Sequence, residues 1–296
     1  MPPEQYLSDC KQFIDESIDR FLPRPGAFPD SLHESMRYSL FAGGKRLRPS
    51  LLIAAAEAVG GDRREVLAFA VAVEFLHTYT LIHDDLPALD NDNFRRGKPT
   101  NHKVFGEAIA ILAGDALLTQ AFALMTQAAL TGHAPPKSIL RAAHELGKAL
   151  GSTGVIGGQV VDLESEGRPV EESTLEYIHI YKTGYFFKSC IRVGAILSQA
   201  SPAQLGALSR FGAHIGLAFQ IVDDILDITG DQKKLGKDVG SDLDKNKATY
   251  PALFGLEESR NKAEKLVEEG IACLEDFDER ADPLREIGRF FVQRTF

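Results

Sequence analysis

Apolar residues recur at spacings of three and four along almost the whole chain, and runs of alternating polar and apolar residues are missing. This period is typical of helices that bury one face. Predicted helices span residues 66–81, 108–130, 138–150, 174–197 and 204–228. Segment 66–81 has few polar positions, so we expect other helices to surround it. The pattern predicts an all-α fold.

Clusters of glycine and proline separate the predicted helices, at residues 23–26, 60–62, 132–136, 167–169 and 201–202. These residues end helices and form turns. None of the separating segments has the composition of a flexible linker, and no repeat is visible. We therefore expect residues 1–296 to form a single domain. A helical bundle of this kind builds its sites around a central cavity, from side chains on facing helices.

The composition narrows the possible functions. With 33 basic and 42 acidic residues the formal net charge is −9, which argues against a broad face for nucleic acid. The three cysteines, Cys10, Cys190 and Cys273, form no metal or disulfide pattern, as expected for reduced thiols in the cytoplasm. The N-terminal residues lack the apolar core of a signal peptide, and no apolar run reaches the roughly 18 residues of a membrane span. We expect a soluble cytoplasmic protein without stable membrane insertion.

Three aspartates, Asp84, Asp85 and Asp90, follow the most apolar predicted helix. They repel one another, and the negative end of the helix dipole disfavours them further. Pro87 breaks the regular turn, so Asp90 need not follow helical spacing. Carboxylates that lie close together despite this repulsion are typical of a cation site, and oxygen ligands favour magnesium or calcium. A solvated acidic loop is the alternative.

A second acidic cluster lies on another apolar helix. Asp223 and Asp227 are four residues apart, so they share one helix face about 6 Å apart along the axis. Their neighbours are apolar, and this face must therefore look into the protein or its cleft. Two inward clusters on separate helices could clamp metal ions between them.

Magnesium bound by few carboxylates typically completes its coordination with phosphate oxygens. Cations should therefore surround the site, although any single one could be an ordinary surface charge. The candidates beside glycine turns or acidic motifs are Lys45, Arg46, Arg48, Arg95, Arg96, Lys182, Lys237 and Lys247. Other motifs fail: Gly44-Lys45 is no P-loop, because Arg46 replaces the required Ser or Thr. A helical His-Asp phosphohydrolase would need further ligating histidines and would leave the second cluster unexplained.

Several motifs along the chain together resemble the trans-isoprenyl diphosphate synthases. They are Gly43-Gly44-Lys45-Arg46-Leu47-Arg48-Pro49, His77, the first aspartate motif ending in Arg95-Arg96-Gly97, Gly157-Gly158-Gln159, Tyr181-Lys182-Thr183-Gly184, Phe219-Gln220 before the second aspartate motif, and Lys247-Ala248-Thr249-Tyr250-Pro251. The four-residue spacer with Pro87 resembles the bacterial and plastid branch, which includes farnesyl and geranylgeranyl diphosphate synthases. Asn93-Phe94 departs from relatives that carry another acid there.

The resemblance implies the isoprenoid synthase fold, a homodimer, and head-to-tail condensation of isopentenyl diphosphate with dimethylallyl or geranyl diphosphate. Magnesium ions, usually three, would lie between Asp84, Asp85 and Asp90 on one side and Asp223 on the other, with Asp227 acting through a water. They would neutralise the leaving diphosphate. The allylic carbocation is then attacked by the isopentenyl double bond, and the proton goes to the released diphosphate.

The resemblance also divides the cations between two substrates. Arg95, Lys182 and Lys237, helped by Lys247, would hold the allylic diphosphate. Lys45, Arg48, His77 and Arg96 would hold isopentenyl diphosphate. Thr183 and Gln220 would offer oxygen dipoles to the carbocation. His77 lies on an apolar helix, so a purely structural role is its alternative.

We expect the growing product chain to run beside the helix before the first aspartate motif, with side chains about one turn before Asp84 forming the floor of its cavity. Helical geometry places Thr80 about 40° and Tyr79 about 140° from Asp84, which favours Thr80 as the cavity floor. The resemblance favours Tyr79, because the fifth residue before the motif commonly gates length and is bulky in farnesyl synthases. We therefore expect farnesyl diphosphate, with geranylgeranyl diphosphate as the alternative. A class I terpene cyclase or a non-catalytic scaffold of the same fold would also be helical, but each would be expected to lack at least one of the two aspartate clusters.

Overall fold

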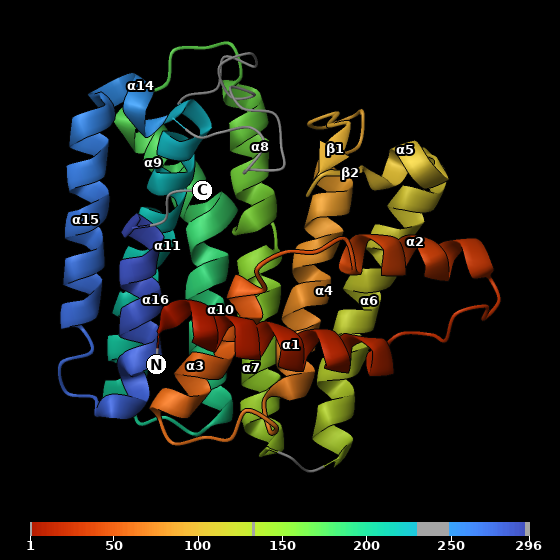
Figure 1. Ribbon diagram of the computed structural model, residues 1–296, viewed down its shortest axis with the longest axis horizontal. Coiled ribbons are helices and arrows are strands. Elements are labelled where there is room, and N and C mark those ends of the chain that lie inside the picture. The colour runs from red at the N-terminus through yellow and green to blue at the C-terminus, as the bar shows by residue number, and fades with distance from the viewer. Residues whose placement is uncertain (1, 132–133, 230–248, 294–296) are drawn as a thin grey trace.

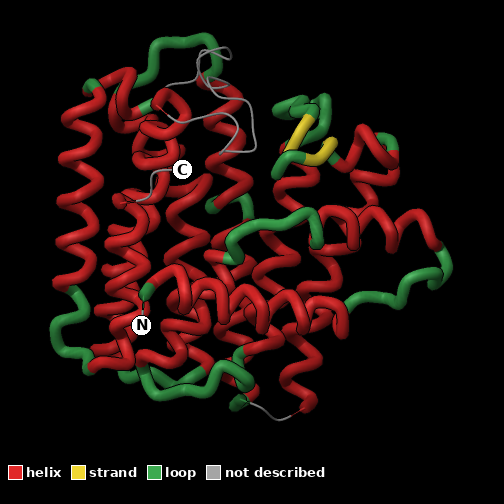
Figure 2. Tube along the Cα trace, in the orientation of Figure 1, coloured by secondary structure: helices red, strands yellow, loops and turns green. Residues whose placement is uncertain are grey.

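The computed structural model describes residues 2–131, 134–229 and 249–293, and it shows a bundle of helices with one short β-hairpin among these residues (Figures 1 and 2). The first half contains α1 (Pro3–Phe21), α2 (Asp30–Leu40), α3 (Leu47–Ala58), α4 (Leu67–Asp84), β1 (Phe94–Arg95), β2 (Lys98–Pro99), α5 (Asn101–Phe105), α6 (Glu107–Thr131) and α7 (Pro136–Leu150). The second half contains α8 (Val155–Ser165), α9 (Glu172–Ile178), the π-helix η1 (His179–Gly184), α10 (Tyr185–Leu197), α11 (Pro202–Thr229), α14 (Tyr250–Phe254), α15 (Leu256–Ala272), the 3₁₀ turn η2 (Glu279–Ala281) and α16 (Asp282–Gln293).

The structure confirms the all-α prediction and each of the five predicted helical segments. Segment 174–197 differs in detail, because α9, η1 and α10 follow one another with a π-helical turn between two α-helices. Such wide turns are rare and frequently mark functional sites. The hairpin was not predicted, since strands of two residues are too short to show alternating polarity.

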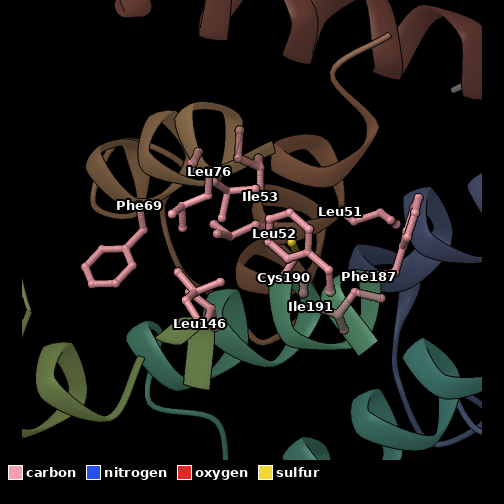
Figure 3. Packing of buried hydrophobic residues seen from close by; sticks show 14 of the residues in the cluster. Leu51, Leu52, Ile53, Phe69, Leu76, Leu146, Phe187, Cys190 and Ile191 are labelled. Atoms are coloured by element: carbon pink, nitrogen blue, oxygen red, sulfur yellow. The ribbon is translucent and has the colours of Figure 1, made fainter. Parts of the chain in front are cut away.

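The hydrophobic core lies where α3, α4, α7 and α10 meet (Figure 3). Leu52 of α3, Leu76 of α4 and Ile191 of α10 are fully buried there. A Cβ atom at Gly194 would lie 2.0 Å from the carbonyl oxygen of Leu52, so only glycine allows α10 to approach α3 this closely. The prediction that segment 66–81 is surrounded by other helices is confirmed, because most residues of α4 are buried and none is exposed.

Among the described residues, two helices, α6 and α11, are long and apolar enough to cross a membrane when judged by length and composition alone. Helix α11 packs against α10 and α15, so much of its apolar surface is used within the bundle. Helices α4 and α11 both end at the upper side of Figure 1, near the hairpin and α14. The fold thus brings the ends of the two aspartate-bearing helices to the same side of the bundle.

Candidate active site

The first aspartate cluster forms where α4 ends and the chain folds back on itself. The backbone N–H of Asp90 donates to the carbonyl oxygen of Asp84 at 2.8 Å, so Asp90 returns beside the helix end. The pKa of Asp84 is raised to about 6, chiefly by burial; the charges of Lys182 and Arg95 lower it, and those of Asp90 and Asp85 raise it. The structure therefore brings Asp84, Asp90 and Lys182 together, as predicted from the sequence.

Asp85 has a different environment from Asp84. It is 3% exposed, and both carboxylate oxygens accept from the Nε of Arg95, at 2.7 and 2.9 Å. Arg95 Nη2 also lies 2.6 Å from Asp85 Oδ1, and contact through two nitrogens fixes the plane of the guanidinium. The structure thus places Asp85 against a protein cation, and its prediction as a metal ligand stays a prediction.

The hairpin sends its two arginines in different directions. Arg95 ends β1 and contacts Asp85, whereas Arg96 follows with a positive φ of 54°. The Arg96 guanidinium donates to the carbonyl oxygen of Gly43 and lies against Gly44, in the turn before α3. Adjacent arginines thus reach separate parts of the site, and their division between two diphosphates stays a prediction.

The second aspartate cluster lies on α11 and is more deeply buried. Asp224 and Asp227 are almost fully buried, whereas Asp223 is partly exposed. Asp223 lies within electrostatic reach of Arg48, whose pKa is lowered by burial and raised slightly by this carboxylate. Lys237 and Lys247, two predicted contacts of the allylic diphosphate, lie outside the described residues.

Arg48 and His77 form a pair between α3 and α4. Arg48 Nη1 lies 3.2 Å from His77 Nε2, and its guanidinium covers the Phe187 ring at 4.6 Å. Burial, together with Arg48 and Arg96, holds the pKa of His77 well below its usual value. Because arginine only donates, the neutral imidazole accepts through Nε2 and carries its proton on Nδ1. His77 therefore orients Arg48 through Nε2, and its contact with isopentenyl diphosphate stays a prediction.

The two cations next to Arg48 along the chain differ in exposure. Lys45 is exposed, as a ligand-binding lysine can be. Arg46 is buried and bonds to Asp15, Glu74 and the carbonyl oxygen of Leu40. Arg46, a candidate cation in the sequence, therefore joins α1, α2 and α4 and stabilises the fold.

Lys182 and Thr183 lie on the π-helical turn η1, both partly buried. The Lys182 ammonium contacts Asp162 of α8 at 2.6 Å. A Cβ atom at Gly158 would lie 2.4 Å from the Lys182 backbone nitrogen, so a glycine here lets α8 approach the turn. Asp162 was missed as a site residue; its position one turn after Gln159 on α8 was the available signal.

The arrangement offers carboxylates from α4 and α11 together with cations from α3, the hairpin and η1. Among the described residues, no three acidic, histidine or cysteine side chains converge closely enough to hold an ion by themselves. Magnesium commonly binds through one or two carboxylates and takes its other ligands from phosphates and water. The raised pKa of Asp84 reflects buried negative charge that a cation would relieve. These residues therefore fit magnesium that arrives together with a diphosphate.

Comparisons with known proteins agree on one family. A sequence model of the polyprenyl synthetase family matches residues 29–283. The chain is 51% identical over 259 residues to a farnesyl diphosphate synthase of Geobacillus stearothermophilus, with 88% of this chain and 86% of that protein covered. It is 45% identical over 291 residues to a geranylgeranyl diphosphate synthase of Cyanophora paradoxa, covering 98% and 96%. The solved structure of an FPP/GFPP synthase from Zymomonas mobilis has a TM-score of 0.86 and 37% identity, covering 98% of both chains.

Proposed function

Because this chain belongs to the polyprenyl synthetase family and is a head-to-tail prenyltransferase, we propose that its product is farnesyl diphosphate. Its substrates are isopentenyl diphosphate and an allylic diphosphate, dimethylallyl or geranyl. The observation that carries the choice of a C15 product is the buried tyrosine that precedes the first aspartate cluster. The alternative product is geranylgeranyl diphosphate, because relatives of similar identity carry that name.

Tyr79 supports a short product through its bulk and its fixed position. It is 6% exposed on α4, and its ring packs edge-on against His83, with the ring centroids 5.8 Å apart. Burial raises the pKa of Tyr79 to about 12, so the phenol stays neutral. Thr80 is partly buried and donates from Oγ1 to the carbonyl oxygen of His77 at 2.8 Å. A large ring held between helices would limit the space for a growing chain, whereas Thr80 would leave more room.

The chain's own residues supply orientation and charge. Arg95, fixed by Asp85, and Lys182, fixed by Asp162, are the described cations that would hold the allylic diphosphate. Arg48 with His77, Arg96 and the exposed Lys45 would hold isopentenyl diphosphate. Thr183 and Gln220 would offer oxygen dipoles to the cationic carbon. Donors aimed at the developing charge stabilise a transition state more than a ground state.

We propose that Mg²⁺, three ions per site, is bound by Asp84, Asp90 and Asp223, with Asp85 and Asp227 as further predicted ligands. When bound, the metal neutralises the diphosphate as it leaves. Removal of the metal by chelator should abolish condensation. Activity that persists in excess chelator would contradict this proposal.

We also propose a homodimer, on the basis of an exposed apolar face of α6. Ile111, Leu112 and Phe122 are 43%, 52% and 36% exposed, and helical geometry places them on one side of α6. Exposed apolar groups on one side of a helix favour contact with a protein partner. Light scattering should give twice the chain mass, and Leu112→Glu should lower it. A monomeric wild-type protein would contradict the proposal.

The product is tested by incubation with isopentenyl diphosphate, each allylic substrate and Mg²⁺, followed by chromatography. We expect C15, and Tyr79→Ala should shift products to C20 or longer because it removes the ring. Thr80→Ala is the matched control, and it should change product length less. A C20 product from the wild-type enzyme would support the geranylgeranyl alternative, and no condensation would overturn the function. If active Tyr79→Ala still made only a C15 product, Tyr79 would not form the floor of the cavity for the growing chain.

A further inference from the structure

The carboxylate of Asp224 joins three separate elements next to the predicted site. Its Oδ1 accepts from the Gln220 side-chain amide at 3.1 Å, one turn earlier on α11. Its Oδ2 lies 2.7 Å from His179 Nε2 of η1 and accepts from the backbone N–H of Tyr250, in α14, at 3.0 Å. The Tyr250 ring also packs against the His179 ring, with centroids 5.3 Å apart. Asp224 is thus a buried anchor with both oxygens occupied.

The contact with Gln220 has a chemical consequence. A carboxylate only accepts hydrogen bonds, so it selects the NH₂ end of the glutamine amide. The carbonyl oxygen Oε1 must then point away from Asp224, and no hydrogen bond to Oε1 occurs among the described residues. Asp224 therefore decides which end of the Gln220 dipole is presented to its surroundings.

We propose that Asp224 is a positioning residue, which acts through Gln220 by turning the amide oxygen of Gln220 toward the allylic carbocation. The proposal rests on the proposed prenyltransfer and adds a reason for the second aspartate of the α11 cluster. Without this anchor, the amide can rotate and present its NH₂ group, whose partial positive charge would repel the cation. The oxygen of a correctly turned amide attracts it.

Through His179, Asp224 also fixes the position of the π-helical turn η1. His179 begins η1, and Thr183 lies four residues later on the same turn. The bond from His179 to Asp224 therefore ties the element that carries Thr183 to the helix that carries Gln220. The positions of Thr183 and Gln220, whose oxygens are predicted to face the carbocation, thus both depend on the buried carboxylate of Asp224.

Direct metal binding by Asp224 is the competing role. Asp224 is only 3% exposed, and its oxygens already serve three donors from η1, α11 and α14. Three of the roughly four lone-pair positions of this buried carboxylate are therefore already in use, which leaves little room for a metal ion. Asp223 is partly exposed, so the adjacent aspartate is the better ligand. The two roles differ in their expected magnesium dependence.

The test compares Asp224→Asn, Gln220→Met and the double variant with the wild-type enzyme. Binding is measured for an ammonium analogue that mimics the allylic cation, and for an unreactive allylic thiolodiphosphate of the same length. Each single variant should lose about tenfold in affinity for the ammonium analogue, as for one misdirected dipole or hydrogen bond. Affinity for the thiolodiphosphate, whose hydrocarbon chain carries no positive charge, should change less than twofold.

The double variant decides whether Asp224 acts through Gln220. If it does, the double variant loses no more affinity than Gln220→Met alone, because coupled residues are not additive. The Mg²⁺ concentration for half-maximal activity should stay unchanged in Asp224→Asn and rise in the control Asp223→Asn. Additive losses, equal losses for both analogues, or a shifted magnesium requirement in Asp224→Asn would overturn the proposal.

Folding and function are checked separately. Circular dichroism establishes that each variant is folded. If Asp224→Asn does not fold, His179→Gln replaces it, and this variant should lose affinity for the ammonium analogue selectively; equal losses for both analogues would count against the proposal. A wild-type enzyme that makes no prenyl product would overturn the proposed function, whereas an active wild-type enzyme with additive variants would overturn only the role of Asp224.

Discussion

The two aspartate clusters share a pair of adjacent aspartates but use them in different surroundings. On α4, Asp84 is partly buried near Asp90 and Lys182, and Asp85 is paired with Arg95. On α11, Asp223 is partly exposed, and Asp224 is paired with Gln220, His179 and the backbone of Tyr250. In each pair the second aspartate is held by protein donors, while the first keeps more of its surface open. In each pair, the first aspartate is thus the one predicted to bind a ligand, and the second holds neighbouring parts of the protein in place.

The partners of the two scaffold aspartates also differ. Asp85 holds Arg95, which is itself predicted to bind substrate, so Asp85 sets the position of a substrate-binding cation. Asp224 holds uncharged amide and backbone donors together with a histidine, so it acts on the geometry of α11 and η1. The α4 cluster therefore positions charged groups, whereas the α11 cluster also fixes the positions of α11, η1 and α14 relative to one another.

The largest expected effect comes from the first aspartate of each pair. Asp84→Ala and Asp223→Ala should each lower kcat by about 10³-fold or more, because charge stabilisation of the leaving diphosphate is lost. Asp276→Ala, on an exposed loop position, is the control and should be neutral. Steady-state kinetics on proteins with unchanged circular dichroism measure this. Near-normal turnover in either variant would remove that aspartate from the site.

A smaller effect on the KM values should distinguish the cations near the two aspartate clusters. Arg48, within reach of Asp223, should chiefly serve isopentenyl diphosphate, so Arg48→Ala should raise its KM by about 10–100-fold, the loss of one charge-assisted contact. Lys182, near Asp84, should act on the allylic KM and on kcat. Kinetics with each substrate varied in turn distinguish them. Equal effects on both substrates from both variants would argue against two pockets.

Asp85→Asn tests the scaffold role on α4 directly. Loss of the paired charge frees Arg95, so the KM for the allylic substrate should rise about tenfold, with a smaller change in kcat than in Asp84→Ala. The Mg²⁺ requirement should stay near that of the wild-type enzyme. A strongly raised Mg²⁺ requirement would instead support Asp85 as a direct ligand.

The smallest effect concerns stability without metal. The pKa of Asp84 is raised to about 6 in the folded protein, so the folded state loses stability as the pH rises from about 4 to 6. Asp84→Asn in EDTA should therefore raise the Tm at pH 7.5 more than at pH 5. Allowing for partial exposure, the gain is about 1–2 kcal/mol, or about 2–5 °C. Thermal scans measure it; an equal gain at both pH values would contradict a buried charge.

The sequence by itself determined the helical fold, the five long helical segments and the family, because the spacing of apolar residues and the motifs are local properties. It also predicted that Asp84, Asp90 and Lys182 share a site. The missed contacts are those between distant segments. Asp162 reaches Lys182 from 20 residues earlier, and Asp224 reaches His179 from 45 residues later.

Only the tertiary structure decided which member of each aspartate pair is the more deeply buried one. Asp84 and Asp85 are equivalent carboxylates in the sequence, and so are Asp223 and Asp224. Adjacent residues on a helix point about 100° apart, so one of each pair meets neighbouring elements and the other meets the site. Which one does so depends on where the hairpin, η1 and α14 lie, and helix packing sets those positions. The side-chain chemistry is therefore local, while its use as ligand or scaffold is a consequence of packing.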